Sequence, residues 1–263
     1  MRTRVLVATI AAAALLALAA APAASALRVT VRAEGTDRHV IPTTVVNMPA
    51  TRAVVSDTAG NRYLYNDASS ATAANALYWA TELRGVPWVF SVSPLGLFID
   101  SIDGLASDPS TYANWWEFTV NGFASNVGAG DLLAKAGDSY VFFQNPSSDM
   151  LHGAKLLVVR FAPGRSIKAG RAVRITVVGD DLAKADSAAD ARRFHATQIE
   201  TPAHFKPVSG ATLHVGNRVY ELRGSSILIK GLRVGRHAVW AEKAMDATWV
   251  YAPSAITLVN VHR

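Results

Sequence analysis

The side chains whose spacing could support catalysis are few, and the carboxylates come first. Asp100 and Asp103 lie three residues apart where a strand is expected to run into a turn. Glycoside hydrolysis needs two carboxylates that face each other across the scissile bond. Asp103-Gly104 is also an ordinary turn sequence, because both residues tolerate turn geometry. The solvated turn is the favoured interpretation, and a glycan hydrolase is the alternative.

The histidines offer one arrangement that could bind a metal ion. His195, Glu200 and His204 would supply suitable ligands if the chain between them folds back. The seven histidines show neither His-x-His nor His-Glu-x-x-His spacing. We therefore favour isolated surface histidines and predict no metal site.

Two further motifs fall short of a cofactor or ion site. Gly128-Ala129-Gly130 lacks the third glycine of a dinucleotide fingerprint and precedes no strong helix. A cluster of acidic residues lacks the alternating oxygens and central glycine of a calcium loop. These acidic residues are Asp180, Asp181, Asp186 and Asp190. The sequence predicts no cofactor and a protein that is not an enzyme.

Aromatic residues form a stronger pattern than the titratable ones. In the run Trp115 to Val120, alternate side chains point to opposite faces of a strand. Trp116, Phe118 and Val120 are expected in the core, which leaves Trp115 on a mostly polar face. Asn121-Gly122 then predicts a turn, because both residues tolerate positive φ.

A second strand is expected to add to this aromatic face. In the apolar run that begins at Tyr140, Tyr140 and Phe142 face one way while Val141 and Phe143 face the other. If a helix covers the Trp116 face, one of these pairs joins Trp115 on the open side as an exposed binding platform. The predicted ligand-binding residues are Trp115, Tyr140, Phe142, Ser101, Asp103, Asn121 and Phe123.

One helix among several strands must position these residues. Ala71 to Arg84 has helical spacing of apolar residues, with Ser69 or Ser70 as the cap and Gly85 at the C′ position. Strands are predicted at 27–34, 39–46, 54–55, 63–65, 88–92, 97–102, 115–120 and 140–143. This composition fits an α+β fold.

Four short motifs in a fixed order resemble the transcobalamin-like C-terminal domain family, a bacterial and animal family of unknown function. They are Ser101-Ile102-Asp103-Gly104, Trp116 to Gly122, Val127 to Gly130 and Gly137 to Phe143. The resemblance covers roughly residues 27–145. It implies a β-grasp (ubiquitin-like) domain with one helix on a mixed sheet. In transcobalamins that domain covers one face of a cobalamin, so the resemblance implies a corrinoid ligand completed by a partner.

The second half of the chain is predicted to be an all-β, immunoglobulin-like sandwich at 155–263, after a linker at 146–154. Short strands recur there with glycine turns between them. Pro207 to Ala211, Gly231-Leu232 and Gly235 to Val239 resemble bacterial immunoglobulin-like and carboxypeptidase-regulatory-like modules. Such modules are commonly spacers or adhesive units.

The N-terminus predicts export. Arg2 and Arg4 precede an apolar stretch, and Ala24-Ser25-Ala26 is a small-x-small cleavage site. Residues 1–26 are therefore predicted to be a signal peptide cleaved after Ala26, with a membrane anchor as the alternative. We expect a secreted, extracellular protein with no membrane span in the mature chain. Without cysteine, it must be stabilised by packed cores.

Composition also limits the partners. Without residues 1–26, which hold two arginines, the chain has 24 Lys and Arg against 20 Asp and Glu, and the resulting net charge of +4 is modest and spread along the chain. Such a charge does not favour nucleic acid. The leading hypothesis is an exported, non-catalytic binding protein whose aromatic surface holds a corrinoid or another flat, apolar ligand. The alternative is a cell-surface or matrix adhesion protein that binds a cell-envelope protein or glycan.

Overall fold

The computed structural model describes residues 27–36, 38–48, 53–60, 62–65, 71–93, 96–111, 113–125, 127–147, 153–181 and 205–263. We call residues 27–147 the N-terminal region and residues 153–263 the C-terminal region. The predicted signal peptide lies outside the described residues. The predicted domain limits at 145 and 155 stay a prediction, although strand β10 ends at Asn145 and β11 begins at Gly153.

A five-stranded sheet organises the N-terminal region. Its order is β2-β1-β10-β8-β9, with β1 parallel to β10 and the other neighbours antiparallel. Strands from the start and the end of the region therefore lie side by side at its centre. The strands are β1 (Leu27–Glu34), β2 (His39–Met48), β8 (Trp115–Val120), β9 (Phe123–Ala124) and β10 (Ser139–Asn145).

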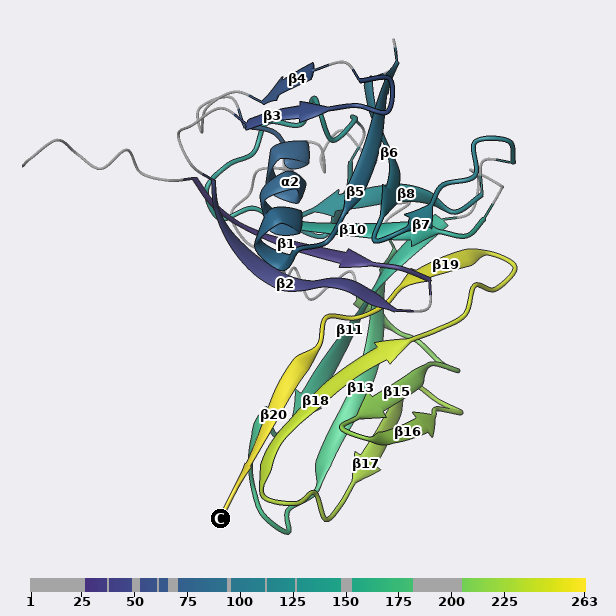
Figure 1. Cartoon of the computed structure of the whole chain (residues 1–263). Coiled ribbons are helices and arrows are strands. Elements are labelled where there is room, and N and C mark those ends of the chain that lie inside the picture. The colour runs from purple at the N-terminus through teal and green to yellow at the C-terminus, as the bar shows by residue number, and fades with distance from the viewer. Residues whose placement is uncertain are drawn as a thin grey trace, which may run out of the picture.

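The helix α2 (Ala73–Arg84) covers one face of this sheet, against β1 and β2 (Figure 1). Its first turn is capped by Asn75, whose Oδ1 accepts a 2.8 Å hydrogen bond from the backbone N–H of Thr72. It ends at Gly85, which adopts φ 64° in the left-handed region. The predicted helix and its C-terminal glycine are confirmed. The N-cap is Thr72, so the prediction of Ser69 or Ser70 as the cap is wrong.

The remaining strands of the N-terminal region form two separate sheets. β3 (Ala53–Ser56) pairs with β4 (Arg62–Tyr65), which confirms the hairpin predicted around Gly60. A three-stranded sheet is made of β5 (Trp88–Ser93), β6 (Gly96–Ile102) and β7 (Leu105–Ala106). Phe90 and Ile99 of this sheet pack in one core with Leu77 of the helix.

Two further five-stranded sheets make up the C-terminal region. One has the order β14-β13-β11-β19 with β17 beside β13, and the other has the order β12-β20-β18-β15-β16. Buried side chains from both sheets share one apolar core, which includes Leu157, Ile175 and Val239. The strands are β11 (Gly153–Ala162), β12 (Ser166–Lys168), β13 (Val173–Asp181), β14 (Phe205–Pro207), β15 (Thr212–Val215), β16 (Arg218–Glu221), β17 (Ser226–Ile229), β18 (Gly235–Glu242), β19 (Trp249–Ala252) and β20 (Thr257–His262).

The predicted fold class, a β-grasp domain with one helix on a mixed sheet followed by an immunoglobulin-like sandwich, is wrong. The described chain is mostly β, with its strands divided among several sheets. In the N-terminal region, β3 and β5 pair with the strands that follow them and stay outside the five-stranded sheet. In the C-terminal region, each sheet contains a parallel pair, β11 with β19 and β12 with β20. Residue alternation predicts where a strand lies and leaves its pairing partner open.

The C-terminal region packs on part of the second face of the N-terminal sheet. Val141 and Phe143 of β10 form a buried cluster with Leu156 of β11 and Ala252 of β19. The C-terminal region then extends away from this contact, and the end of the chain lies at its far end (Figure 1). The N-terminal sheet therefore has packed side chains on both of its faces.

A buried ion-pair network fixes the same contact. The Arg32 guanidinium donates from Nη1 to Glu34 Oε1 and to the carbonyl of Pro253, both at 2.8 Å. Glu34, fully buried, also accepts a hydrogen bond from His39 Nδ1. The ring of His39 meets Trp240 edge-on at 4.5 Å, and Trp240 stacks on His214 at 3.7 Å. Arg32 of β1 and His39 of β2 thus join the N-terminal sheet to Pro253 and Trp240 of the C-terminal region.

Replacing Arg32 with alanine should destabilise the protein strongly. Glu34 would lose its permanent cation while it stays buried, and breaking a buried pair in this way costs about 3–5 kcal/mol. Urea unfolding followed by tryptophan fluorescence measures the change. Arg38→Ala is the matched control, because the Arg38–Asp103 pair is nearly half exposed and should contribute no more than about 1 kcal/mol. Equal effects of the two substitutions would contradict the assigned role of Arg32.

Candidate functional site

The strand register separates the residues that were expected to form an aromatic platform. Trp116, Phe118 and Val120 of β8 pair with Gln144, Phe142 and Tyr140 of β10 and face the helix side. Trp115 pairs with Asn145 and points to the opposite face. Because directly paired residues share a face, Trp115 cannot form one surface with Tyr140 and Phe142.

Tyr140 and Phe142 are core residues, with no exposed surface. Phe142 stacks on Phe118 at 5.4 Å, and the Tyr140 hydroxyl donates a 2.9 Å hydrogen bond to Asp138. Burial, together with the nearby Asp138 carboxylate, raises the pKa of Tyr140 far above its ordinary value. Tyr140 therefore acts as a buried hydrogen-bond donor that stabilises the fold.

Trp115 is the remaining member of the predicted platform, and its indole Nε1 is buried without a hydrogen-bond partner. On the same face, the Asn145 amide donates to Glu117, and burial raises the pKa of Glu117 despite this hydrogen bond. Thr119 Oγ1 is a second buried atom without a partner. This face also carries Phe143, which packs on the C-terminal region. The expected open aromatic surface is therefore not observed, because this face of the sheet packs on the C-terminal region.

Asn121 has a structural role. It adopts φ 52° and Gly122 adopts φ 83°, so the predicted turn between β8 and β9 is confirmed. The Asn121 amide donates to Asp138 Oδ1 at 2.9 Å, and its Oδ1 accepts from the backbone N–H of Ser139 at 3.0 Å. Both polar ends of the side chain are used within the fold.

The other predicted site residues lie apart from this turn. Ser101 is on β6 and half-buried. Asp103 forms the turn after β6 with φ 53° and accepts a 3.1 Å hydrogen bond from Arg38. Phe123 lies on β9, and the structure does not describe its side chain. The predicted ligand-binding residues are not brought together at one site.

A basic cavity lies in the C-terminal region. Sequence analysis predicted a β-sandwich module there and no ligand-binding residue. The volume of the cavity is about 470 Å³, and it opens between the β15–β16 turn and the loop that joins β17 to β18. The turn needs Gly216 at φ 58°. Val215 and Leu232 are buried beneath it and anchor the two segments in the apolar core.

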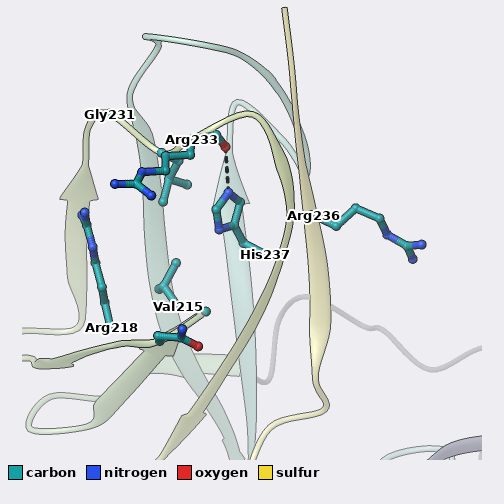
Figure 2. Close-up of a pocket in the computed structure, with 9 residues that line it drawn as sticks. Val215, Arg218, Gly231, Arg233, Arg236 and His237 are labelled. Atoms are coloured by element: carbon teal, nitrogen blue, oxygen red, sulfur yellow. Dashed lines mark hydrogen bonds between the residues drawn. The ribbon is translucent and has the colours of Figure 1, made fainter.

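Cationic side chains dominate the lining of this cavity (Figure 2). Arg218 extends from the start of β16 and Arg233 from the β17–β18 loop, and their guanidinium groups point into the same space. The ring of His237 lies beside them, and its Nε2 donates a 2.8 Å hydrogen bond to the carbonyl of Arg233. This bond holds the loop that carries Arg233. Arg236 borders the cavity but extends its guanidinium in the opposite direction.

No carboxylate lines the cavity. Among the described residues, no ion pair joins Arg218, Arg233 or Arg236 to an acidic side chain. Guanidinium groups bind phosphate and carboxylate oxygens through paired N–H donors. The arrangement can therefore bind an oxyanion, and it contains no nucleophile with an adjacent base.

The sequence analysis did not predict this cavity, although several of the residues that line it belong to the motifs it named. Gly231-Leu232 and Gly235 to Val239 were used only as evidence for a resemblance to immunoglobulin-like and carboxypeptidase-regulatory-like modules. The arginines Arg218 and Arg233 are fifteen positions apart, and no local motif links them. Only the pairing of β15 with both β16 and β18 brings the two segments together.

Nothing in the described part of the chain groups three or more His, Asp or Glu side chains as a metal site. The hypothetical ligands His195, Glu200 and His204 lie outside the described residues, as do Asp186 and Asp190. Over the same described part, no helix is both long enough and apolar enough to span a membrane.

Comparison with known proteins gives a partial match. Residues 65–144 match the model of a family described as "Domain of unknown function (DUF4430)". No curated protein matches the chain. One similar solved structure is a protein from Ruminococcus gnavus that carries a provisional metal-binding name, with 18% identity and a TM-score of 0.29 over 46% of this chain and 97% of that one. Neither the family model nor this solved structure is described as an immunoglobulin-like or carboxypeptidase-regulatory-like module.

Replacing Glu117 with glutamine should stabilise the protein at neutral pH. Since burial raises the pKa of Glu117 in the folded state, its charged form is disfavoured there, and stability is lost as pH rises above the unfolded pKa of about 4.3. Glutamine removes that cost and still accepts the hydrogen bond from Asn145. Thermal unfolding of both proteins from pH 3 to pH 7 measures the effect. We expect no difference at pH 3 and a higher midpoint for Glu117→Gln at pH 7; a lower midpoint at pH 7 would refute the assignment.

Proposed function

We propose that this chain is an exported, non-catalytic binding protein that holds an anionic group in the basic cavity of its C-terminal region. The observation that carries the proposal is the convergence of Arg218 and Arg233 in a cavity without a carboxylate (Figure 2). Two guanidinium groups that share a space repel each other, and a bound oxyanion removes this cost. The cavity volume is within the range of about 300–1,000 Å³ typical of small-molecule sites.

The ligand class follows from the donors. Arg218 and Arg233 together can offer paired N–H groups to a phosphate or a carboxylate, and hydrogen bonds to charged groups contribute about 1.5–3 kcal/mol each. The hydrogen bond from His237 to the Arg233 carbonyl keeps one of these donors in place before the ligand arrives. A phosphate ester or a carboxylate is therefore the proposed ligand.

A non-catalytic role agrees with how the candidate catalytic carboxylates are used. Asp100 accepts a 2.8 Å hydrogen bond from the Ser91 hydroxyl, and Asp103 pairs with Arg38. Both groups are engaged by local partners, so neither is poised as the acid or nucleophile of a glycan hydrolase.

The corrinoid ligand rests on the transcobalamin-like resemblance alone. The surface intended for it is not available in this structure, because Tyr140 and Phe142 are buried and Trp115 lies on the other side of the sheet. A corrinoid remains a prediction for a site completed by a partner. The alternative, a cell-surface interaction protein, fits the basic cavity better than a corrinoid-binding protein does if its partner is anionic. Export of the chain rests on the predicted signal peptide.

Removing either arginine charge at the cavity should weaken anion binding without unfolding the protein. We expect Arg218→Gln and Arg233→Gln each to weaken binding of sn-glycerol 3-phosphate at least about ten-fold, because each removes one charged donor pair. Isothermal titration calorimetry at low salt measures the affinity, and circular dichroism confirms the fold of each variant.

Arg236→Gln is the matched control, because it removes the same charge from a side chain that points away from the cavity. Its affinity should stay within about two-fold of the unaltered protein. Absence of binding to glycerol phosphate, inorganic phosphate and acetate alike would overturn the proposed function. An equal loss in all three variants would also overturn it, because binding would then follow net charge alone.

A further inference from the structure

The loop that joins β17 to β18, which lines the basic cavity, lies at the end of the C-terminal region farthest from the N-terminal region (Figure 1). Four connections meet at this end, which we call the distal end. They are the β11–β12 connection, the β12–β13 connection, the β15–β16 turn and the β17–β18 loop. The register places them together, since Lys168 pairs with His262, Gly235 with Val261 and Val173 with Ile229.

The distal end concentrates positive charge that appeared scattered along the sequence. Its residues 163–172, 215–218, 230–237 and 257–263 contain no Asp or Glu. They carry eight Lys and Arg residues, all of them exposed. These residues are Arg165, Lys168, Arg171, Arg218, Lys230, Arg233, Arg236 and Arg263. Since the whole chain has a formal net charge of only +6, the two ends of the molecule differ strongly in charge.

Exposed apolar side chains lie among these cations. Val234 is 54% exposed in the β17–β18 loop, between Arg233 and Gly235-Arg236. Val219 is 58% exposed and follows Arg218 directly. A protruding apolar side chain with arginines beside it suits an anionic lipid surface, where the cations meet headgroups and the apolar group reaches the acyl boundary.

We propose that the distal end docks on the surface of a bilayer that contains anionic phospholipids, with one lipid phosphate in the basic cavity. This inference rests on the proposed function, because the cavity that binds a soluble phosphate ester would bind the same group on a lipid. Arg218 and Arg233 hold that phosphate. Lys230, Arg236 and the other exposed cations lie over neighbouring headgroups, and Val234 enters the boundary.

A linear polyanion fits the same surface less well. The cations are spread over the tips of several connections and the end of the chain, while a linear chain is usually held in a groove that follows its backbone. The cavity lining has no Trp, Tyr or Phe on which a nucleic-acid base could stack. A linear polyanion, whether a nucleic acid or another polymer, gives no reason for Val234 and Val219 to be exposed.

The test uses the chain from residue 27 onward and large unilamellar vesicles in a co-sedimentation assay. We expect binding to phosphatidylcholine vesicles that contain 30% phosphatidylglycerol, and none to phosphatidylcholine alone. Arg218→Gln and Arg236→Gln should each weaken this binding by about five-fold or more, since each cation near an anionic surface contributes a factor of that order. Val234→Ser should weaken it while the affinity for soluble glycerol phosphate is unchanged. Lys135→Gln, an exposed cation of the N-terminal region, is the charge-matched control and should have no effect.

The outcomes separate this inference from the proposed function. Binding of glycerol phosphate without binding to anionic vesicles would overturn membrane docking and leave the proposed function intact. Binding to long-chain polyphosphate but not to vesicles would identify a polyanion as the partner and also overturn the docking. Vesicle binding that Lys135→Gln weakens as much as Arg236→Gln would show unspecific attraction and overturn the assigned surface. If neither vesicles nor glycerol phosphate bind, both proposals fall.

Discussion

The contact between the two regions is the constraint on which the rest of this molecule depends. The N-terminal sheet carries Arg32, Glu34 and Glu117 on one face, and charged groups can be buried there only with partners in place. Arg32 binds both Glu34 and the backbone of Pro253, so the partner of this face is the C-terminal region. Val141 and Phe143 pack on Leu156 and Ala252, so the centre of this face is occupied by the C-terminal region.

The cavity proposed as the binding site lies at the opposite end of the molecule. The C-terminal region uses one end to cover the N-terminal sheet and leaves its other end to four connections and the end of the chain. The apolar core holds Val215 and Leu232 beneath two of these connections, so Arg218 and Arg233 extend from fixed positions. The backbone of both segments is thus in place before a ligand arrives, which lowers the ordering cost of binding. In the proposed function, recognition is therefore assigned to the C-terminal region alone.

Local signals predicted much of the secondary structure and little of the site. Gly85 and Asn121-Gly122 have backbone angles that few other residues tolerate, so the helix end and the turn were predictable. Trp115 was rightly separated from Trp116 by strand alternation, but alternation cannot show that a second region covers a face. The pairing of β1 with β10 and the meeting of Arg218 with Arg233 depend on contacts between distant segments. The same holds for the positive charge: it looked dispersed in the sequence and gathers only when β11, β12, β13, β15, β17, β18 and β20 bring their ends together.

The central claim is that recognition takes place at the distal basic end and not at the aromatic strands of the N-terminal sheet. The most direct measurement is a two-dimensional amide spectrum of the isotope-labelled protein during titration with sn-glycerol 3-phosphate. The account predicts saturable shifts confined to the amides around Gly216 to Arg218 and Lys230 to His237. Shifts centred on Trp115 to Asn145, with none at these two segments, would contradict it.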